Sequence, residues 1–188
     1  MRLVEQVHAF VRAHLQAGDI AIDATAGNGH DTCFLAERVG PDGLVFAFDI
    51  QRAALNATRA RLATRGMEER ARLILADHAC LADHLPGPLH SRLGAVLFNL
   101  GYLPGGDHAL TTRPHTTLAA IAAARAILPP RGVIAITGYR GHTGGEAECR
   151  VIDQALQGRA RPLRRIETPN HGPIAWLIAP KASGSRRD

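Results

Sequence analysis

Two short segments of the sequence are almost entirely apolar, and each ends at a polar residue that begins a loop. They are residues 44–49 (LVFAFD) and residues 95–99 (AVLFN). Strands without a polar face are typical of a parallel sheet that is covered by helices on both sides. A chain with such strands must also supply the helices that cover them.

Helical and strand-like segments alternate along the rest of the chain. Apolar spacing and the Gly and Pro breakers predict helices at 3–16, 30–39, 52–65, 116–128 and 146–156. They predict strands at 20–24, 44–49, 72–76, 95–99, 133–137, 163–167 and 174–179. Such alternation forms a doubly wound, mainly parallel α/β sheet, which binds its ligand outside the carboxyl ends of the strands. The loops after the strands are therefore predicted to form one site.

Length and composition fit one folded domain. The chain has 188 residues, of which 46% are apolar and 21% charged, so we expect one domain over 1–180 and a disordered tail at 181–188. No apolar run reaches the roughly 18–20 residues of a membrane span, and the first residues lack the apolar core of a signal peptide. Three widely spaced cysteines predict neither a disulfide framework nor a zinc site. We therefore expect a cytoplasmic protein without a bound metal, while homodimer formation stays open.

Positive charge is concentrated at the C-terminal end. The net charge is +5, and residues 150–188 hold eight basic and three acidic residues, so the part before them is neutral overall. A basic surface of this kind attracts a polyanion such as RNA. A basic surface that only contacts solvent, followed by a disordered tail, explains the same pattern. Charge alone does not decide between RNA binding and this alternative.

A glycine-containing loop follows the first predicted strand. It reads DATAGNGHDT over residues 23–32, and Asp49 ends the next strand twenty residues after Gly29. Glycines allow a tight turn and close approach of a ligand to the backbone, and a carboxylate at this distance suits a ribose diol. S-adenosylmethionine (SAM), a dinucleotide and a nucleotide-free turn of the same shape all fit this pattern.

Three features favour SAM. Thr32 stands where a pyrophosphate site usually has a third glycine. Asp23 is unfavourable beside a diphosphate but suits the ammonium and sulfonium groups of SAM. The chain is also too short for a separate dehydrogenase substrate domain. We therefore predict that Asp49 binds the SAM ribose, and that Asp23 and the backbone of residues 27–29 bind its methionine part.

The loop after residues 95–99 carries residue types that suit methyl transfer to an amine. Such transfer needs an uncharged amine, so hydrogen-bond acceptors should converge on it. Asn99 followed by Leu100, Gly101 and Tyr102 resembles the Asn-Pro-Pro-Tyr loop of amine-directed methyltransferases, although Leu100 and Gly101 replace both prolines. In that loop the Asn oxygen and the next carbonyl hold the amine. The competing interpretation is a turn in which Asn99 caps backbone and Tyr102 packs at the core edge.

Further polar residues lie in the same predicted region. Asp107 and the adjacent His108 are candidates for removing a proton from an ammonium acceptor, with a solvated loop acid as the alternative. Tyr102 and Tyr139 are the only tyrosines, and both suit stacking on a base or filling a gap. Arg140, which follows Tyr139, is a candidate for a phosphate contact. The alternative is that its loop only connects a strand to the next helix.

Taken together, these motifs resemble the bacterial rRNA methylase family, which includes the tRNA (5-aminomethyl)uridine methyltransferase that acts at the wobble position. The resemblance covers roughly residues 20–180, and GNGHDT with NLGYLPGGD are its most specific parts. The other matching residues are FDIQ (48–51), Thr111, Pro114, Thr116, Thr117, Tyr139, Gly141, His142, Gly145, Glu148, Asn170, His171 and Pro173.

The resemblance implies a class I SAM-dependent methyltransferase fold, a seven-stranded sheet whose last strand is antiparallel. It implies N-methylation of the aminomethyl group on wobble uridine, with the tRNA anticodon stem-loop as partner. The predicted cofactor-binding residues are Asp23, Gly27, Asn28, Gly29, His30, Asp31, Asp49, Gln51, Asp77 and His78. The predicted catalytic residues are Asn99, Tyr102 and Asp107. The predicted substrate-binding residues are Leu100, Gly101, Thr116, Tyr139, Arg140 and His142.

Two other functions stay open at this stage. One is a methyltransferase that acts on rRNA or on a small amine. The other is a noncatalytic RNA-binding protein that keeps the fold.

Overall fold

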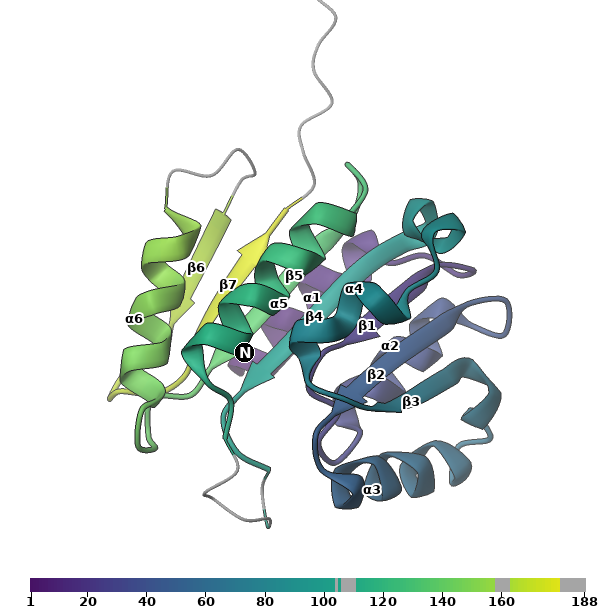
Figure 1. Cartoon of the computed structure of the whole chain (residues 1–188), viewed down its shortest axis with the longest axis horizontal. Helices are drawn as coiled ribbons and strands as arrows, with labels where there is room; N and C mark the ends of the chain where they lie inside the picture. Colours follow the sequence, from purple (N-terminus) through teal and green to yellow (C-terminus); the bar gives the residue numbers. More distant parts are fainter. Residues whose placement is uncertain (104, 106–110, 158–162, 180–188) are drawn as a thin grey trace, which may run out of the picture.

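The sheet of this protein has seven strands in the order β3-β2-β1-β4-β5-β7-β6 (Figure 1). The structure is a computed structural model, and it describes residues 1–103, 105, 111–157 and 163–179. The strands are β1 (Ile20–Asp23), β2 (Leu44–Asp49), β3 (Ala71–Leu75), β4 (Leu93–Leu100), β5 (Val133–Gly138), β6 (Leu163–Glu167) and β7 (Ile174–Ile178). Only β7 runs antiparallel to its neighbours, so the predicted sheet and its antiparallel last strand are confirmed.

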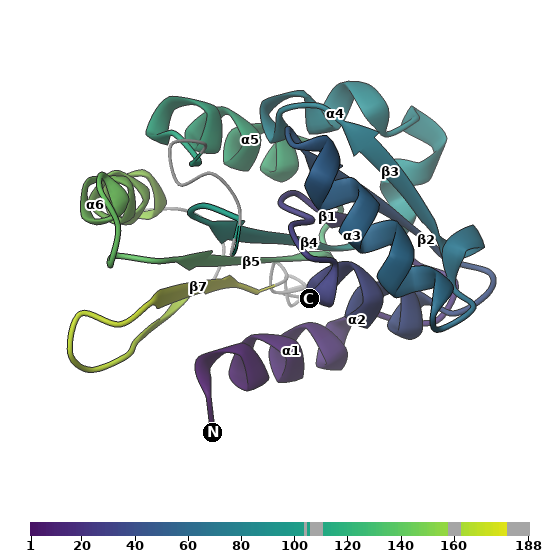
Figure 2. The same ribbon diagram turned by 90° about the horizontal axis from the view of Figure 1, so that it is seen from below.

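Helices cover both faces of the sheet (Figure 2). The α-helices are α1 (Leu3–His14), α2 (His30–Val39), α3 (Arg52–Ala63), α4 (Leu81–His84), α5 (Pro114–Ile127) and α6 (Gly145–Leu156). The first three pack on one face, and the last three pack on the other. Short 3-10 helices lie at η1 (Glu68–Arg70), η2 (His78–Cys80) and η3 (Gly87–Arg92). None of the helices among the described residues is both long and apolar enough to span a bilayer.

The buried central strands explain this two-sided cover. All residues of β1 and β5 are buried, and β4 is buried except at Asn99. Each side chain of a strand points to one face or the other, so a strand without polar side chains needs apolar partners on both. Leu3, Val7 and Val11 supply part of that cover because they share the buried face of α1.

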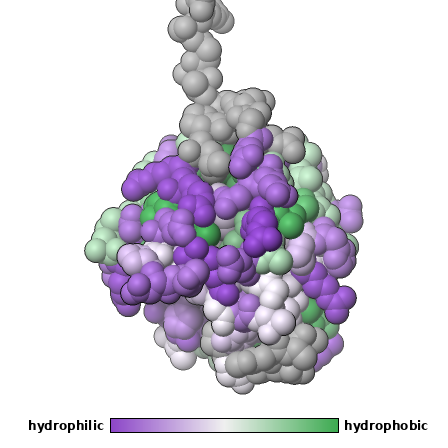
Figure 3. Space-filling view, turned by 90° about the vertical axis from the view of Figure 1, so that its left-hand side faces the viewer, coloured by the Kyte–Doolittle hydropathy of each residue, from purple (hydrophilic) through white to green (hydrophobic). Residues whose placement is uncertain are grey.

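The β6–β7 hairpin closes one edge of the sheet, and its surface is mostly hydrophilic (Figure 3). Arg165 on β6 donates to Asp153 of α6 at 3.0 Å and to Glu167 at 2.6 Å. Asp153 also accepts from the indole N–H of the fully buried Trp176, at 2.6 Å. Charged side chains on an edge strand discourage pairing with another chain.

Predicted element bounds agree with the structure to within about two residues. The helix at 30–39 and the strands at 44–49 and 163–167 have the predicted ends. The fourth strand extends over 93–100, beyond the predicted 95–99, because Leu93 pairs with Ile20 of β1 and residues 93 and 94 are both buried. The short helical turns between residues 78 and 92 were missed, since three- to six-residue helices leave no periodic pattern. The predicted tail at 181–188 lies outside the described residues.

Candidate functional site

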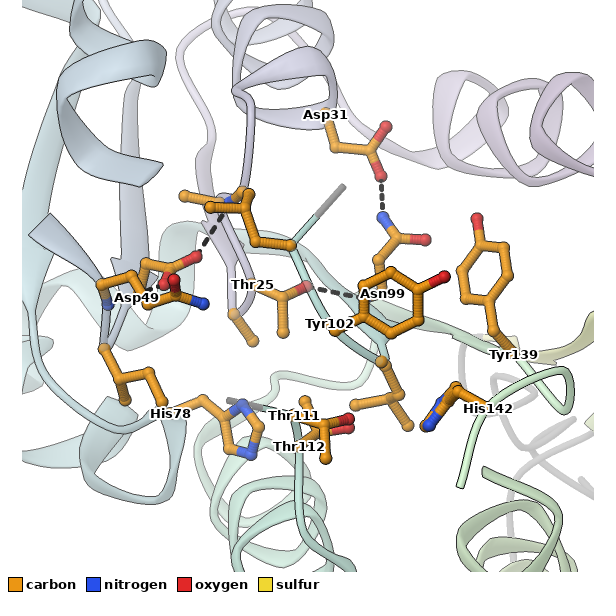
Figure 4. Close-up of a pocket in the computed structure, with 18 of the residues that line it drawn as sticks. Thr25, Asp31, Asp49, His78, Asn99, Tyr102, Thr111, Thr112, Tyr139 and His142 are labelled. Carbon is orange, nitrogen blue, oxygen red and sulfur yellow. Dashed lines mark hydrogen bonds between the residues drawn. The ribbon is translucent and has the colours of Figure 1, made fainter. Parts of the chain in front are cut away.

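A cavity of about 1110 Å³ opens at the carboxyl ends of the parallel strands. The loops after β1, β2, β3, β4 and β5 all contribute to its wall, together with the start of α5 and the β6–β7 turn. Figure 4 shows that side chains from these separate loops face the same space. The sequence prediction that these loops form one site is therefore correct as to position.

Asp49 is held in place at one end of the cavity. Its carboxylate accepts the Gly27 backbone N–H and the Gln51 backbone N–H, each at 2.9 Å. Burial raises the pKa of Asp49, while these two hydrogen bonds act in the opposite direction. Gly27 and Gln51 line the cavity as well, so the carboxylate is oriented before any ligand binds.

Gly29 and Asp23 were predicted to contact the cofactor, but neither residue lines the cavity. Gly29 has φ +78°, and a Cβ there would lie 2.7 Å from the Thr58 Cα of α3, so its role is close packing of α2 on α3. Asp23 is fully buried. It accepts the Thr32 hydroxyl at 2.6 Å and the Thr25 backbone N–H at 3.2 Å. Its carboxylate thus fixes the loop from inside.

His78 lies below Asp49 in the view of Figure 4, and Asp77 lines the same cavity. Asp77 caps η2 by accepting the Ala79 backbone N–H at 2.8 Å. Burial lowers the pKa of His78, which keeps its imidazole neutral near pH 7. Its Nε2 is buried without a hydrogen-bond partner. Buried polar atoms without a partner are uncommon in folded proteins, and this one belongs to a residue that lines the cavity.

The polar groups of the cavity fit SAM better than a dinucleotide. Three carboxylates line it, those of Asp31, Asp49 and Asp77. Negative groups attract a sulfonium and an ammonium and repel a diphosphate. Asn28 and His30 also line this end, and partial burial lowers the pKa of His30. Within the described part of the chain, no group of three His, Cys, Asp or Glu side chains is arranged to hold a metal.

Asn99 lies at the centre of the cavity and is fixed by two elements. Its backbone N–H donates to the Thr25 hydroxyl at 2.7 Å, and its side-chain Nδ2 donates to Asp31 Oδ2 at 2.5 Å. Asp31 belongs to the first turn of α2. A carboxylate only accepts hydrogen bonds, so the amide NH₂ must face Asp31 and the amide oxygen must face away from it. Figure 4 shows this oxygen on the side of Tyr139.

The other end of the cavity is aromatic. The rings of Tyr102 and His142 meet edge to face with centroids 5.7 Å apart. Tyr139 is 46% exposed, and burial of the rest of its side chain raises its pKa, with a smaller contribution from Asp31. His142 Nδ1 lies 3.1 Å from the Thr143 carbonyl, and its Nε2 is buried without a partner.

The backbone around this aromatic end is closely packed. The Leu100 carbonyl accepts the Tyr139 backbone N–H at 3.4 Å, a long bond that leaves a lone pair available. A Cβ at Gly101 would lie 3.5 Å from His142 Nε2, an ordinary contact distance, so the space there would admit a side chain. Thr116 lines the cavity, and its hydroxyl donates to the Arg113 carbonyl. Asp107 and His108 lie outside the described residues.

Arg140 lines the cavity, and its guanidinium already has partners within the protein. Its guanidinium donates to the Gly172 carbonyl at 2.9 Å, the Thr168 carbonyl at 3.3 Å and Glu167 at 2.5 Å. The side chain is only 11% exposed. Arg140 therefore ties the loop after β5 to the β6–β7 turn, because two carbonyls and a carboxylate there accept N–H groups from all three nitrogens of its guanidinium.

Residues that sequence reasoning missed complete the wall. Thr25 holds the Asn99 backbone, as described above. Thr111 lines the cavity with a buried hydroxyl that has no partner. The neighbouring Thr112 and the buried Thr117 both donate to Glu148, each at 2.7 Å. Thr111, Thr117 and Glu148 are among the family motifs, but only the fold shows that Glu148 is 3% exposed and joins α6 to α5.

The family described as "Putative rRNA methylase" matches residues 45–163. The chain belongs to the rRNA methylase family. A structure described as an rRNA methylase, from Clostridium thermocellum, is 35% identical and has a TM-score of 0.89, covering 96% of this chain and 98% of the other. A methyltransferase structure from Streptococcus mutans, solved with S-adenosylhomocysteine (SAH), is 31% identical with a TM-score of 0.81 and covers 96% and 98%. The rRNA methylase family fold is thus that of class I SAM-dependent methyltransferases.

The name of another relative of this chain includes a substrate. The chloroplastic tRNA (mnm5s2U34)-methyltransferase of Arabidopsis thaliana is 38% identical over 160 residues. The match includes 81% of this chain and 58% of the Arabidopsis protein. The chain thus spans little more than half the length of that relative.

Proposed function

We propose that this rRNA methylase family member is a SAM-dependent N-methyltransferase that acts on tRNA. Its substrate is the aminomethyl group of 5-aminomethyluridine at the wobble position, and its product is 5-methylaminomethyluridine. The macromolecular partner is the anticodon stem-loop. The family, the fold and the name of the Arabidopsis relative support this assignment, and the geometry of Asn99 carries it.

The orientation of the Asn99 amide is the deciding observation. Its NH₂ group is committed to Asp31 at 2.5 Å, so its oxygen is presented to the cavity as an acceptor. A primary amine has two N–H donors and one lone pair when it is neutral. An amide oxygen that accepts one N–H orients the amine without giving it a proton. The Leu100 carbonyl would accept the second N–H.

The cofactor end is assigned to residues that face the same cavity. Asp49 would accept the ribose hydroxyls, because two backbone N–H groups already orient its carboxylate. The Asp31 and Asp77 carboxylates would attract the positive charge of the cofactor. When bound, SAM supplies an electrophilic methyl group and a neutral thioether leaving group.

The aromatic end is assigned to the base. Tyr139, which is half-exposed, and Tyr102 both line the cavity. Single-stranded RNA bases are commonly bound by stacking on such rings after they leave the helix. A wobble base stacked here would bring its substituent at carbon 5 toward Asn99. Exposed Arg150 and Arg164 then remain for the phosphates in the described C-terminal region, since Arg165 is paired within the hairpin.

Nucleoside mass spectrometry of tRNA from a strain without the gene tests the proposal. We expect 5-aminomethyluridine to accumulate and 5-methylaminomethyluridine to disappear. A plasmid copy of the natural gene should restore the product, and a copy with Asn99→Ala should not. An unchanged wobble nucleoside would remove the proposal, and a lost rRNA methyl group instead would favour the rRNA activity that the family name suggests.

A further inference from the structure

His8 of α1 is connected to Asn99 although it does not line the cavity. Its Nε2–H donates to Asp31 Oδ1 at 2.7 Å. The other oxygen of the same carboxylate accepts from Asn99 Nδ2 at 2.5 Å. Three side chains from α1, the start of α2 and the end of β4 therefore form one continuous chain of hydrogen bonds into the site.

Each member of this chain limits the next one. The His8 ring stacks on Phe34 of α2, with centroids 3.8 Å apart and planes 3° from parallel, so its rotation is restricted. The Asp31 side chain is only 11% exposed. With one oxygen held by His8, the Asp31 carboxylate cannot turn freely, and the second oxygen stays directed at Asn99. The amide oxygen of Asn99 then keeps one direction into the cavity.

We propose that His8 is a positioning residue for methyl transfer. By fixing Asp31, it holds the Asn99 amide in the orientation that accepts the N–H of the substrate amine. This inference rests on the proposed function, because it assigns His8 to that same step. His8 itself does not line the cavity, and the Asp31 carboxylate is still present there when His8 is replaced, so we expect a larger effect on the orientation of the amine than on cofactor affinity.

Matched substitutions separate the hydrogen bond from the packing. His8→Phe keeps an aromatic ring on Phe34 but removes the donor to Asp31. His8→Gln restores a donor on a neutral side chain. His14→Phe is the control, because His14 lies on the same helix, its Nδ1 hydrogen-bonds to the Phe10 carbonyl of the preceding turn, and it does not line the cavity.

Kinetics on a stem-loop RNA that carries 5-aminomethyluridine give the first readout. We expect His8→Phe to lower kcat about tenfold, since a hydrogen bond to a charged group contributes on that scale. The KM for RNA and the SAM dissociation constant should stay within about twofold of the natural protein. His8→Gln should recover most of the rate, and His14→Phe should be fully active.

A second readout does not depend on the substrate. The side-chain NH₂ of Asn99 gives a pair of ¹H–¹⁵N signals, which Asn99→Ala identifies by their loss. Its bonded proton should lie downfield in the natural protein and in His8→Gln, and should move upfield in His8→Phe. An inactive natural protein with this pattern would refute the proposed function and leave the positioning role intact.

Other outcomes overturn the inference. A His8→Phe enzyme with unchanged kcat would show that Asn99 needs no support from α1. An equal loss in His14→Phe would assign the effect to the stability of the helix. An Asn99 signal that does not respond to His8→Phe would show that Asp31 keeps its position alone.

Discussion

Gly29→Ala tests whether the glycine loop owes its sequence to packing between helices. Gly29 has φ +78°, a backbone conformation that costs an alanine about 1–2 kcal/mol. The added Cβ would also lie 2.7 Å from the Cα and 2.9 Å from the Oγ1 of Thr58. The Cα belongs to the backbone of α3 and cannot turn aside, so α2 and α3 would have to separate. Overpacking of this kind costs a further ~1–3 kcal/mol.

Gly18→Ala is the matched control. Gly18 has φ +81°, but nothing lies within 4 Å of an added Cβ, so only the backbone cost applies. For a chain of this length, 1 kcal/mol lowers Tm by about 2–4 °C. We expect Tm to fall by roughly 10 °C in Gly29→Ala and by roughly 4 °C in Gly18→Ala.

Thermal unfolding followed by circular dichroism measures both values under one condition. Because Gly29 precedes Asp31 by two residues, the displacement should also disturb the bond to Asn99 and slow methyl transfer. Equal losses of Tm in the two variants would refute the packing argument. The need for glycine at position 29 would then come from the backbone angle alone.

Three further substitutions test other parts of the site. Asn99→Ala should leave the SAM dissociation constant, measured by calorimetry, within about threefold, and should lower kcat about 100-fold because it removes an acceptor used in the reaction; a tenfold loss of SAM affinity would contradict this role. Burial, with a smaller contribution from Asp31, raises the pKa of Asp23 to about 7, so the folded protein binds a proton there that the unfolded chain releases near pH 4. The contribution of this proton to the free energy of unfolding is fully present below about pH 4, and it is lost as the pH rises through 7. The Asp23→Asn side chain stays neutral at every pH. Its free energy of unfolding, measured with denaturant and compared with that of the natural protein, should therefore rise by roughly 2–3 kcal/mol between about pH 5 and pH 8. If the difference between the two free energies of unfolding did not change with pH, Asp23 would be ionised throughout this range. Glu148→Ala leaves the hydroxyls of Thr112 and Thr117 without their acceptor, so chemical denaturation should show a loss of about 2–4 kcal/mol, and a change below about 0.5 kcal/mol would mean that water replaces the carboxylate.

The sequence predicted the strands and the site region because both depend on local patterns. The run LVFAFD has no polar face, and β2 is accordingly buried at its centre. The polar residues that follow the strands meet at one edge of the sheet, because parallel strands carry their carboxyl ends to the same side. These properties can be read within a window of a few residues.

The sequence did not predict which distant groups the polar side chains bind. Arg140 suited a phosphate by type, but its partners Glu167 and Gly172 come from a hairpin about thirty residues away. Asp23 suited an ammonium, but the Thr32 hydroxyl and its own burial assign it to the interior. A donor or an acceptor can be identified from the sequence, whereas its partner depends on the folded chain.

His8 shows the same limit most clearly. A histidine in an amphipathic helix is usually a packing or surface residue, and no spacing connects it with Asn99, 91 positions later. The fold brings both to Asp31, because α1 and α2 pack on the same face of the sheet as neighbours.

Methyl transfer in a defined reaction tests the central claim most directly. Purified protein, SAM and two synthetic anticodon stem-loops suffice, one with 5-aminomethyluridine at the wobble position and one with plain uridine. The account predicts one methyl group on the aminomethyl nitrogen of the first RNA, located by fragment mass spectrometry, and none on the second. Equal methylation of both RNAs, or methylation of rRNA alone, would contradict it.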